Sequence, residues 1–135
     1  EMIGDRVNDI ASNSIKLLDV RKNEDDSLIE RLSQIGVIAY TMFDKAVSSI
    51  FDGNLTIASD AVDMYDTIER EESTLMKRFQ NGSSLELSGI VSEIAWDLEI
   101  IAEHSSAIAE IAIDIVLKRE NEYCHAIKAL PKISR

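Results

Sequence analysis

The sequence predicts an all-α domain, an elongated antiparallel helical bundle, and three observations support that prediction. Apolar residues make up 45% of the chain, which has only five Gly and one Pro, a balance typical of long helices. The single Pro131 lies near the end of the chain, so no predicted helix contains a breaker. Apolar residues recur at steps of three and four, without the turn-separated alternation that is typical of strands.

The first two helices are predicted over residues 2–20 and 28–51. Each has one apolar face at the spacing of an amphipathic helix, and a short polar stretch separates them. Ser27 and Glu30 have the spacing of a capping box, in which each side chain binds a free amide of the first turn. We therefore expect the second helix to begin at this pair.

The last two helices are predicted over residues 55–80 and 84–121. Gly53 tolerates a left-handed helix end and Asn54 can cap the next helix, so the chain turns there. Glu72 falls on the apolar stripe of the third helix, a conflict that the sequence leaves open. Ser83 and Glu86 repeat the capping-box spacing. The fourth helix would span roughly 57 Å, and the short loops force neighbouring helices to run antiparallel.

Composition limits the possible function classes. A net charge of −11 repels phosphate backbones, so we expect no direct nucleic-acid contact by this segment. The lone Cys124 excludes an intramolecular disulfide and fits a reducing compartment. No run of about 18 apolar residues predicts a membrane span, and no signal peptide is present, so we expect a cytoplasmic location. No nucleophile elbow, phosphate-binding glycine loop or paired cysteine motif occurs, and no catalytic residue is predicted.

Residues 1–20 and 99–118 are two copies of one sequence unit. An offset of about 98 residues implies a repeat of three helices. We therefore expect residues 1–22 to be the last helix of an upstream repeat, 23–121 a complete repeat, and 122–135 a C-terminal tail. The abrupt start within a helical pattern predicts two further helices upstream. The identical pairs are Glu1 and Glu99, Ile3 and Ile101, Ile10 and Ile108, Ala11 and Ala109, and Ile15 and Ile113.

These motifs resemble those of the PhoU-type phosphate-uptake regulators, which have two three-helix repeats. The third helix of each family repeat carries a Glu-Arg-Ile-Gly-Asp-His…Ile-Ala-Glu pattern. The resemblance covers nearly the whole chain, up to about residue 117. The first copy reads Glu1-Met2-Ile3-Gly4-Asp5 and then Ile10-Ala11, and the second reads Glu99-Ile100-Ile101-Ala102-Glu103-His104 and then Ile108-Ala109-Glu110.

The resemblance implies metal clusters bound by acid-x-x-x-acid motifs on the outside of the bundle. Carboxylates four residues apart lie one above the other on a helix, so they can share a hard cation, although a solvated acidic face has the same spacing. The family's middle helix adds a second acid pair; alignment places Tyr65, which departs from that pattern, and Glu69 at these positions. The ligands predicted for a divalent or ferric metal (Zn, Fe, Mg or Ni) are Glu1, Asp5, Asp66, Glu69, Glu99 and Glu103.

The resemblance further implies a non-catalytic regulator of phosphate uptake and phosphate-starvation signalling. Its partners would be the ATPase of a phosphate ABC transporter and a sensor kinase, and some relatives carry an upstream DNA-binding domain, which connects the family to transcription regulation. The apolar first helix needs a neighbour, which its own second unit or another copy in a homo-oligomer such as a dimer can supply. Trp96, off the main stripe, indicates contact with another helix or partner, and His104 is read as a solvated or packing residue.

Two other functions remain open from the sequence. Glu122 and His125 have the Glu-x-x-His spacing of ferritin-like metal-binding and redox bundles, but those proteins need a second such pair, which the chain lacks. A purely structural coiled-coil interaction domain would show the same apolar stripes without any bound ligand.

Overall fold

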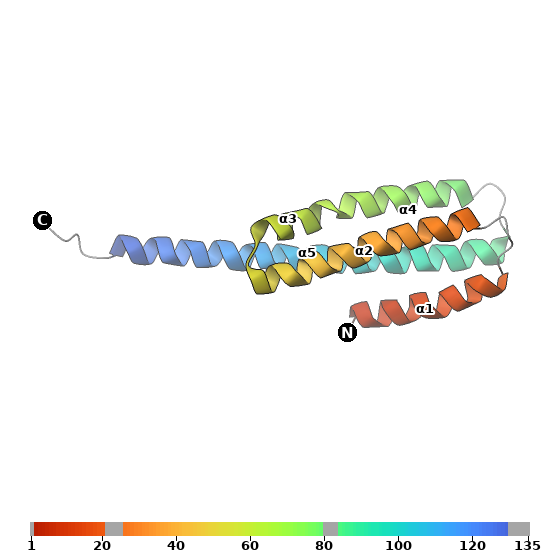
Figure 1. The fold of residues 1–135 in the computed structure, drawn as a ribbon, viewed down its shortest axis with the longest axis horizontal. Coiled ribbons are helices and arrows are strands. Elements are labelled where there is room, and N and C mark those ends of the chain that lie inside the picture. The colour runs from red at the N-terminus through yellow and green to blue at the C-terminus, as the bar shows by residue number, and fades with distance from the viewer. Residues whose placement is uncertain (1, 21–25, 80–83, 130–135) are drawn as a thin grey trace, which may run out of the picture.

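The computed structural model describes residues 2–20, 26–79 and 84–129, and every regular element in these ranges is an α-helix (Figure 1). The rods run antiparallel, with α2 and α5 in one direction and the others in the opposite one. The predicted all-α bundle is confirmed. The helices are α1 (Met2–Val20), α2 (Asp26–Asp52), α3 (Leu55–Asp63), α4 (Tyr65–Phe79) and α5 (Leu85–Ala129).

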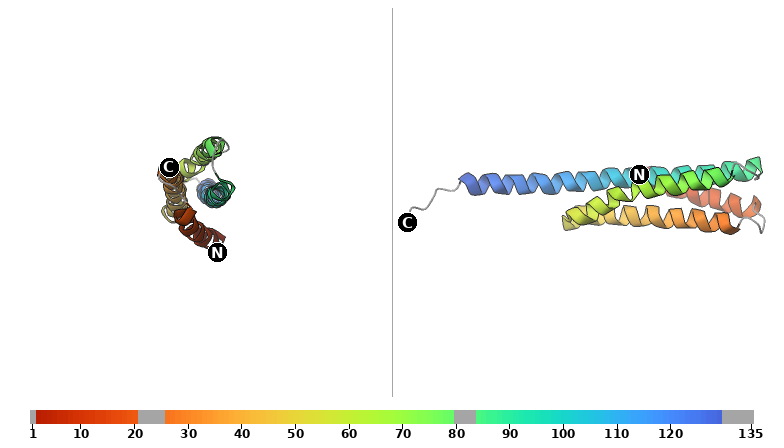
Figure 2. Two further views of the ribbon diagram at one scale, coloured as in Figure 1. Left: turned by 90° about the vertical axis from the view of Figure 1, so that its right-hand side faces the viewer. Right: turned by 90° about the horizontal axis from the view of Figure 1, so that it is seen from above.

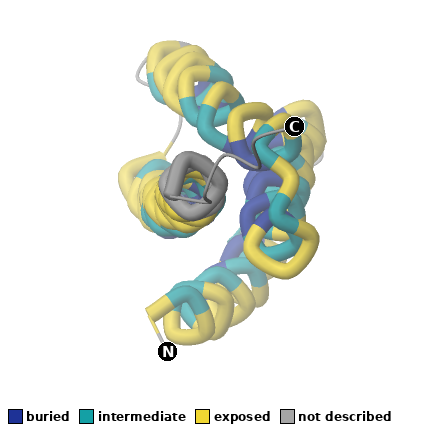
Figure 3. Tube along the Cα trace, turned by 90° about the vertical axis from the view of Figure 1, so that its left-hand side faces the viewer, coloured by how far each residue is buried: buried dark blue, intermediate teal, exposed yellow. Residues whose placement is uncertain are grey.

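Helix α5 is the centre of the bundle, because each of the other four helices packs against it. It contains 45 residues, which at 1.5 Å per residue gives a rod about 67 Å long. The end-on views show α1, α2 and the α3–α4 rod arranged around one side of α5 (Figures 2 and 3). Within the described ranges, α1 approaches α5 alone. None of the described helices is both long and apolar enough to cross a membrane.

Small side chains form much of the contact surface of α5. Its buried residues alternate alanines with larger apolar groups, and buried alanines of α2 and α3 also belong to the core. Alanine has little side-chain volume, so helix backbones can approach closely where it lies at the contact. The core is therefore a narrow seam along α5. The buried alanines are Ala39, Ala46, Ala58, Ala61, Ala95, Ala102, Ala109 and Ala112.

The turn between α2 and α3 has the structure that the sequence predicts. Gly53 has φ of 61°, the left-handed conformation that glycine tolerates. The Asn54 side chain then accepts hydrogen bonds from the amides of Thr56 and Ile57, at 3.0 and 3.2 Å. These bonds satisfy two of the free amides at the start of α3.

The predicted third helix, over residues 55–80, is wrong in one respect, because it is two helices divided at Met64 (Figure 1). The break is slight: the Met64 amide still donates to the Asp60 carbonyl at 3.2 Å, and the Thr67 amide donates to the Met64 carbonyl at 3.1 Å. No Pro or Gly occupies the position, and nothing in the structure explains the break.

Three predicted helix ends also differ from the structure. Helix α2 begins at Asp26, one residue before the expected Ser27 cap. Helix α5 is capped by Ser84, whose hydroxyl accepts a hydrogen bond from the Leu87 amide at 3.2 Å, whereas the predicted cap Ser83 lies outside the described residues. Helix α5 also continues to Ala129 rather than ending at residue 121. Caps one residue apart have nearly the same sequence signal, which explains the two shifted starts. The longer C-terminal end of α5 is a separate difference, since no breaker residue precedes Pro131.

An ion pair connects α1 to α5. Arg6 Nη1 donates a hydrogen bond to Asp97 Oδ1 at 2.9 Å, and Asp97 is only 3% exposed. This hydrogen bond to Asp97 raises the pKa of Arg6 above its ordinary value. A buried carboxylate needs such a partner, so the pair sets the position of α1 along α5. Ile15 is exposed, whereas its repeat counterpart Ile113 packs against the core, so α1 buries less of its apolar face than α5 does.

Candidate functional site

Five polar residues meet where α4 packs along α5. Tyr65, Glu69 and Glu72 follow one another at steps of four and three on α4, so they lie on one side of that helix. Glu99 and Glu103 lie four residues apart on α5, and the charges of the two sets act on one another. Ile68 and Leu75 of α4 are fully buried and hold this helix in the bundle. We call Tyr65, Glu69, Glu72, Glu99 and Glu103 the acidic cluster.

The environment of Glu72 changes the pKa of its carboxyl group. Burial raises its pKa above the ordinary value, and the charge of Glu99, a hydrogen bond with Glu99 and the charge of Glu69 raise it further. Two carboxylates cannot both be ionised and share a hydrogen bond, so the protonated Glu72 donates to Glu99. The half-buried Glu72–Glu99 pair is therefore more stable when Glu72 is protonated.

Tyr65 occupies the position where the PhoU-type pattern has an acid. Burial raises the pKa of its phenol, and the charges of Glu99, Glu69, Glu103 and Glu72 raise it further, in that order. The phenol therefore stays neutral at physiological pH. A neutral hydroxyl at this position removes one negative charge from a cluster that already has four carboxyl groups.

The structure brings together three of the six predicted ligand residues. Glu69, Glu99 and Glu103 belong to the acidic cluster, whereas the exposed Asp66 is not among the groups acting on Tyr65 or Glu72. Asp5 lies on α1, where its charge acts on Arg6. Glu1 lies outside the described residues. The two halves of the sequence repeat therefore do not form one common site.

The donor chemistry of the acidic cluster suits a hard cation, because carboxylate oxygens are the ligands that such ions prefer. The geometry of the acidic cluster, however, does not match that of a metal site. Across residues 2–20, 26–79 and 84–129, no three His, Cys, Asp or Glu side chains come close enough to hold a metal ion. Metal binding would need these side chains to come closer together and the proton between Glu72 and Glu99 to leave.

Glu72 is the site residue that the sequence reading missed, although the sequence contained a signal for it. An acid on the apolar stripe of a helix conflicts with burial, and such local conflicts often mark functional positions. Trp96 is 57% exposed and lines a polar hollow with Arg6 and Lys16 of α1, so it lies on the side of α5 that adjoins α1. Glu122 lies on the part of α5 past the other described helices, where no ferritin-like partner pair faces it.

Comparison with protein-family models identifies the family of this helical bundle. A model of the PhoU domain matches residues 32–112, more than half of the chain, from the first turns of α2 to the buried Ala112 of α5. The chain belongs to the PhoU domain family. This PhoU domain includes the whole acidic cluster, and the family supports a non-catalytic regulatory role in phosphate uptake in general. Comparison with curated proteins and with solved structures found no match. Helix α1 lies outside the matched range, so its assignment to an upstream repeat stays a prediction.

Glu72→Gln should stabilise the PhoU domain at neutral pH and reduce the dependence of its stability on pH. Because the folded-state pKa of Glu72 is raised, the folded protein binds the extra proton between the ordinary and the raised value, and stability falls as pH rises through that window. The amide keeps a donor for Glu99 without the buried charge. We expect a gain of about 0.5–1 kcal/mol at pH 8, allowing for partial solvent screening, in urea unfolding between pH 4.5 and 8.

Glu71→Gln is the matched control, because Glu71 forms an ion pair of 3.7 Å with Arg31 on α2. We expect no gain from it at any pH. If Glu72→Gln proved as neutral or destabilising as Glu71→Gln at pH 8, the account of the raised Glu72 pKa would be wrong.

Proposed function

We propose that this PhoU domain restrains phosphate uptake and phosphate-starvation signalling by binding the ATPase of a phosphate ABC transporter and the associated sensor kinase. The observation that carries the proposal is the family match over residues 32–112, which runs from α2 through α3 and α4 into α5. Its action would be protein binding without turnover. The absence of any recognisable nucleophile motif in the sequence is consistent with that reading.

The acidic cluster supports a surface for a basic partner. Glu69 and Glu103 are exposed, and their charges lie near the half-buried Glu72–Glu99 pair, so negative charge is concentrated at one place on the α4–α5 face. Clustered charge of one sign accelerates encounter with a partner of opposite sign and selects against wrong partners. The rigid α5 would hold both of its acids in a fixed geometry during binding.

Charge reversal at the two exposed acids should weaken partner binding. For Glu69→Lys/Glu103→Lys we expect the Kd for the purified transporter ATPase to rise about tenfold or more, because attraction at the interface becomes repulsion. The control is Glu86→Lys/Glu93→Lys, with two exposed acids of α5 outside the cluster, which should change the Kd less than about threefold. Equal effects of both pairs would refute the acidic cluster as the contact surface, and no binding by the wild type would refute the partner.

We also propose that Glu69, Glu99 and Glu103 bind a divalent or ferric metal, with the unexpected Tyr65 weakening the site. Metal content of the purified protein, measured by elemental analysis after loading and desalting, should fall in Glu99→Gln/Glu103→Gln and rise in Tyr65→Glu, which restores the expected acid. Asp66→Asn, next to Tyr65 but outside the acidic cluster, should leave the content unchanged. If the wild type and Tyr65→Glu both contained equal, near-zero metal, the proposal that these residues bind a metal would be wrong.

A further inference from the structure

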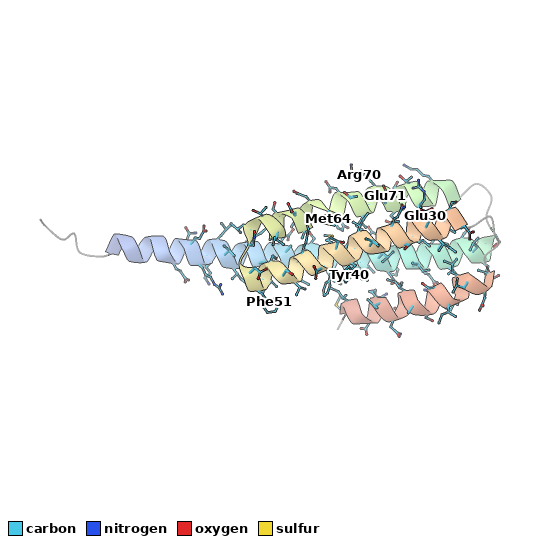
Figure 4. All side chains as sticks on the ribbon, in the orientation of Figure 1. Glu30, Tyr40, Phe51, Met64, Arg70 and Glu71 are labelled. Atoms are coloured by element: carbon cyan, nitrogen blue, oxygen red, sulfur yellow. The ribbon has the colours of Figure 1, made fainter. Side chains whose placement is uncertain are left out.

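Helix α2 has an uncovered side opposite the side that it buries. Its buried residues, from Leu28 to Ser49, face the bundle, and among the described helices α2 packs against α3, α4 and α5. The residues half a turn away are exposed and recur at steps of three, four and seven, so they lie on one line along the helix. Tyr40 and Phe51 lie along the same edge of α2 in Figure 4. We call this line the outer stripe, which consists of Glu30, Ser33, Val37, Tyr40, Asp44 and Phe51.

The outer stripe exposes three large apolar side chains. The exposed fractions are 62% for Val37, 69% for Tyr40 and 83% for Phe51. Single exposed apolar residues are common on protein surfaces, but these three share one line over about 21 Å of helix. Aromatic side chains contribute much of the binding energy at protein interfaces. The outer stripe therefore has the composition of a contact surface.

A hollow adjoins the outer stripe on each side. One, of about 460 Å³, lies between α1, α2 and α5, and Tyr40 is part of its wall. The other, of about 580 Å³, lies between α2 and α4, with Glu30 in its wall. Ser33 and Val37 border both hollows. Because helices pack with the ridges of one in the grooves of the other, a helix lying along the outer stripe has room for side chains on both sides of it.

The outer stripe carries acids and no base. Glu30 and Asp44 lie on it about 21 Å apart, with the apolar Val37 and Tyr40 between them. The two bases of α2 lie off the stripe and pair with other helices, since Arg31 lies 3.7 Å from an acid of α4 and Lys45 lies 3.1 Å from an acid of α3. The bases of α2 therefore do not neutralise its outer stripe, and a complementary partner brings positive charge.

We propose that the outer stripe binds an amphipathic helix of another protein, with an apolar centre and Lys or Arg near each end. The apolar side chains of that helix would cover Val37 and Tyr40, and its bases would pair with Glu30 and Asp44. A second copy of this chain is disfavoured as the occupant, because each copy carries a net charge of −11. An anionic membrane surface would be repelled for the same reason. The outer stripe lies on α2, so it is a different surface from the acidic cluster of α4 and α5.

The probe for this surface is a fluorescein-labelled helical peptide with a Leu-rich central face and two Lys near each end, the two pairs about 21 Å apart. Fluorescence anisotropy should show that the full chain binds this peptide about tenfold or more tightly than a scrambled peptide of the same composition. The scrambled peptide has the same charge but no apolar face, so it measures non-specific attraction to an acidic protein.

Loss of the exposed apolar side chains should weaken binding of the probe. For Val37→Ser/Tyr40→Ser we expect the Kd to rise about tenfold or more. Both residues are exposed, so the helix content measured by circular dichroism should stay unchanged. The control is Trp96→Ser, which removes an exposed aromatic residue of α5 and should change the Kd less than about twofold.

Charge reversal tests the ends of the outer stripe separately. Glu30→Lys/Asp44→Lys should raise the Kd for the probe about tenfold or more, because attraction to its Lys pairs becomes repulsion. The matched control is Glu86→Lys/Glu93→Lys on α5, with the same change in net charge, which should alter the Kd less than about threefold.

Several outcomes would contradict the proposal. They are no binding of the probe by the wild type, equal binding of the scrambled peptide, and control variants as weak as the outer-stripe variants. A wild-type dimer that Val37→Ser/Tyr40→Ser dissociates in sedimentation equilibrium would instead assign the outer stripe to a second copy. Binding of the wild type, but not of that variant, to vesicles of anionic lipid would assign it to a membrane surface.

Discussion

The packing of α5 through its alanine seam is the constraint on which the rest of the structure depends. Helices α2 and α3 approach α5 where small side chains meet, and Ala102, Ala109 and Ala112 are almost completely buried. Because α5 is one uninterrupted helix, side chains on its different sides are fixed relative to one another. Asp97 holds α1, the charges of Glu99 and Glu103 act on Tyr65 of α4, and the last part of α5 extends past the other helices (Figures 1 and 4). A bulky substitution in the seam would therefore disturb all three features together.

The buried Asp97 and the half-buried Glu72 are each stabilised in a different way. Asp97 has the Arg6 guanidinium as a partner, whereas Glu72 shares a hydrogen bond with another carboxyl group and so favours its protonated form. Burying unpaired charge is costly, and a protein that needed only stability would place apolar residues at the position of Glu72. Its presence between α4 and α5 is consistent with a functional surface that the fold tolerates.

The apolar periodicity was sufficient to predict the fold class, because burial along a helix repeats every three to four residues, and Gly53 with Asn54 predicted the turn between α2 and α3. The central position of α5 became visible only in the structure. The periodicity could not predict the break at Met64, which no breaker residue marks. Of the acidic cluster, the resemblance to the PhoU-type pattern predicted Glu69, Glu99 and Glu103, and the last two lie four residues apart on one helix face. The role of Glu72 could be recognised only from the packing of α4 on α5.

The central claim is that this PhoU domain restrains phosphate uptake through the acidic cluster, which α5 holds in place. The most direct measurement is the initial rate of labelled-phosphate uptake in phosphate-replete host cells that lack the protein. We predict that uptake is raised in these cells, that the wild type restores restraint, and that Glu69→Lys/Glu103→Lys fails to do so at equal expression. Unchanged uptake with and without the wild-type protein would contradict the claim.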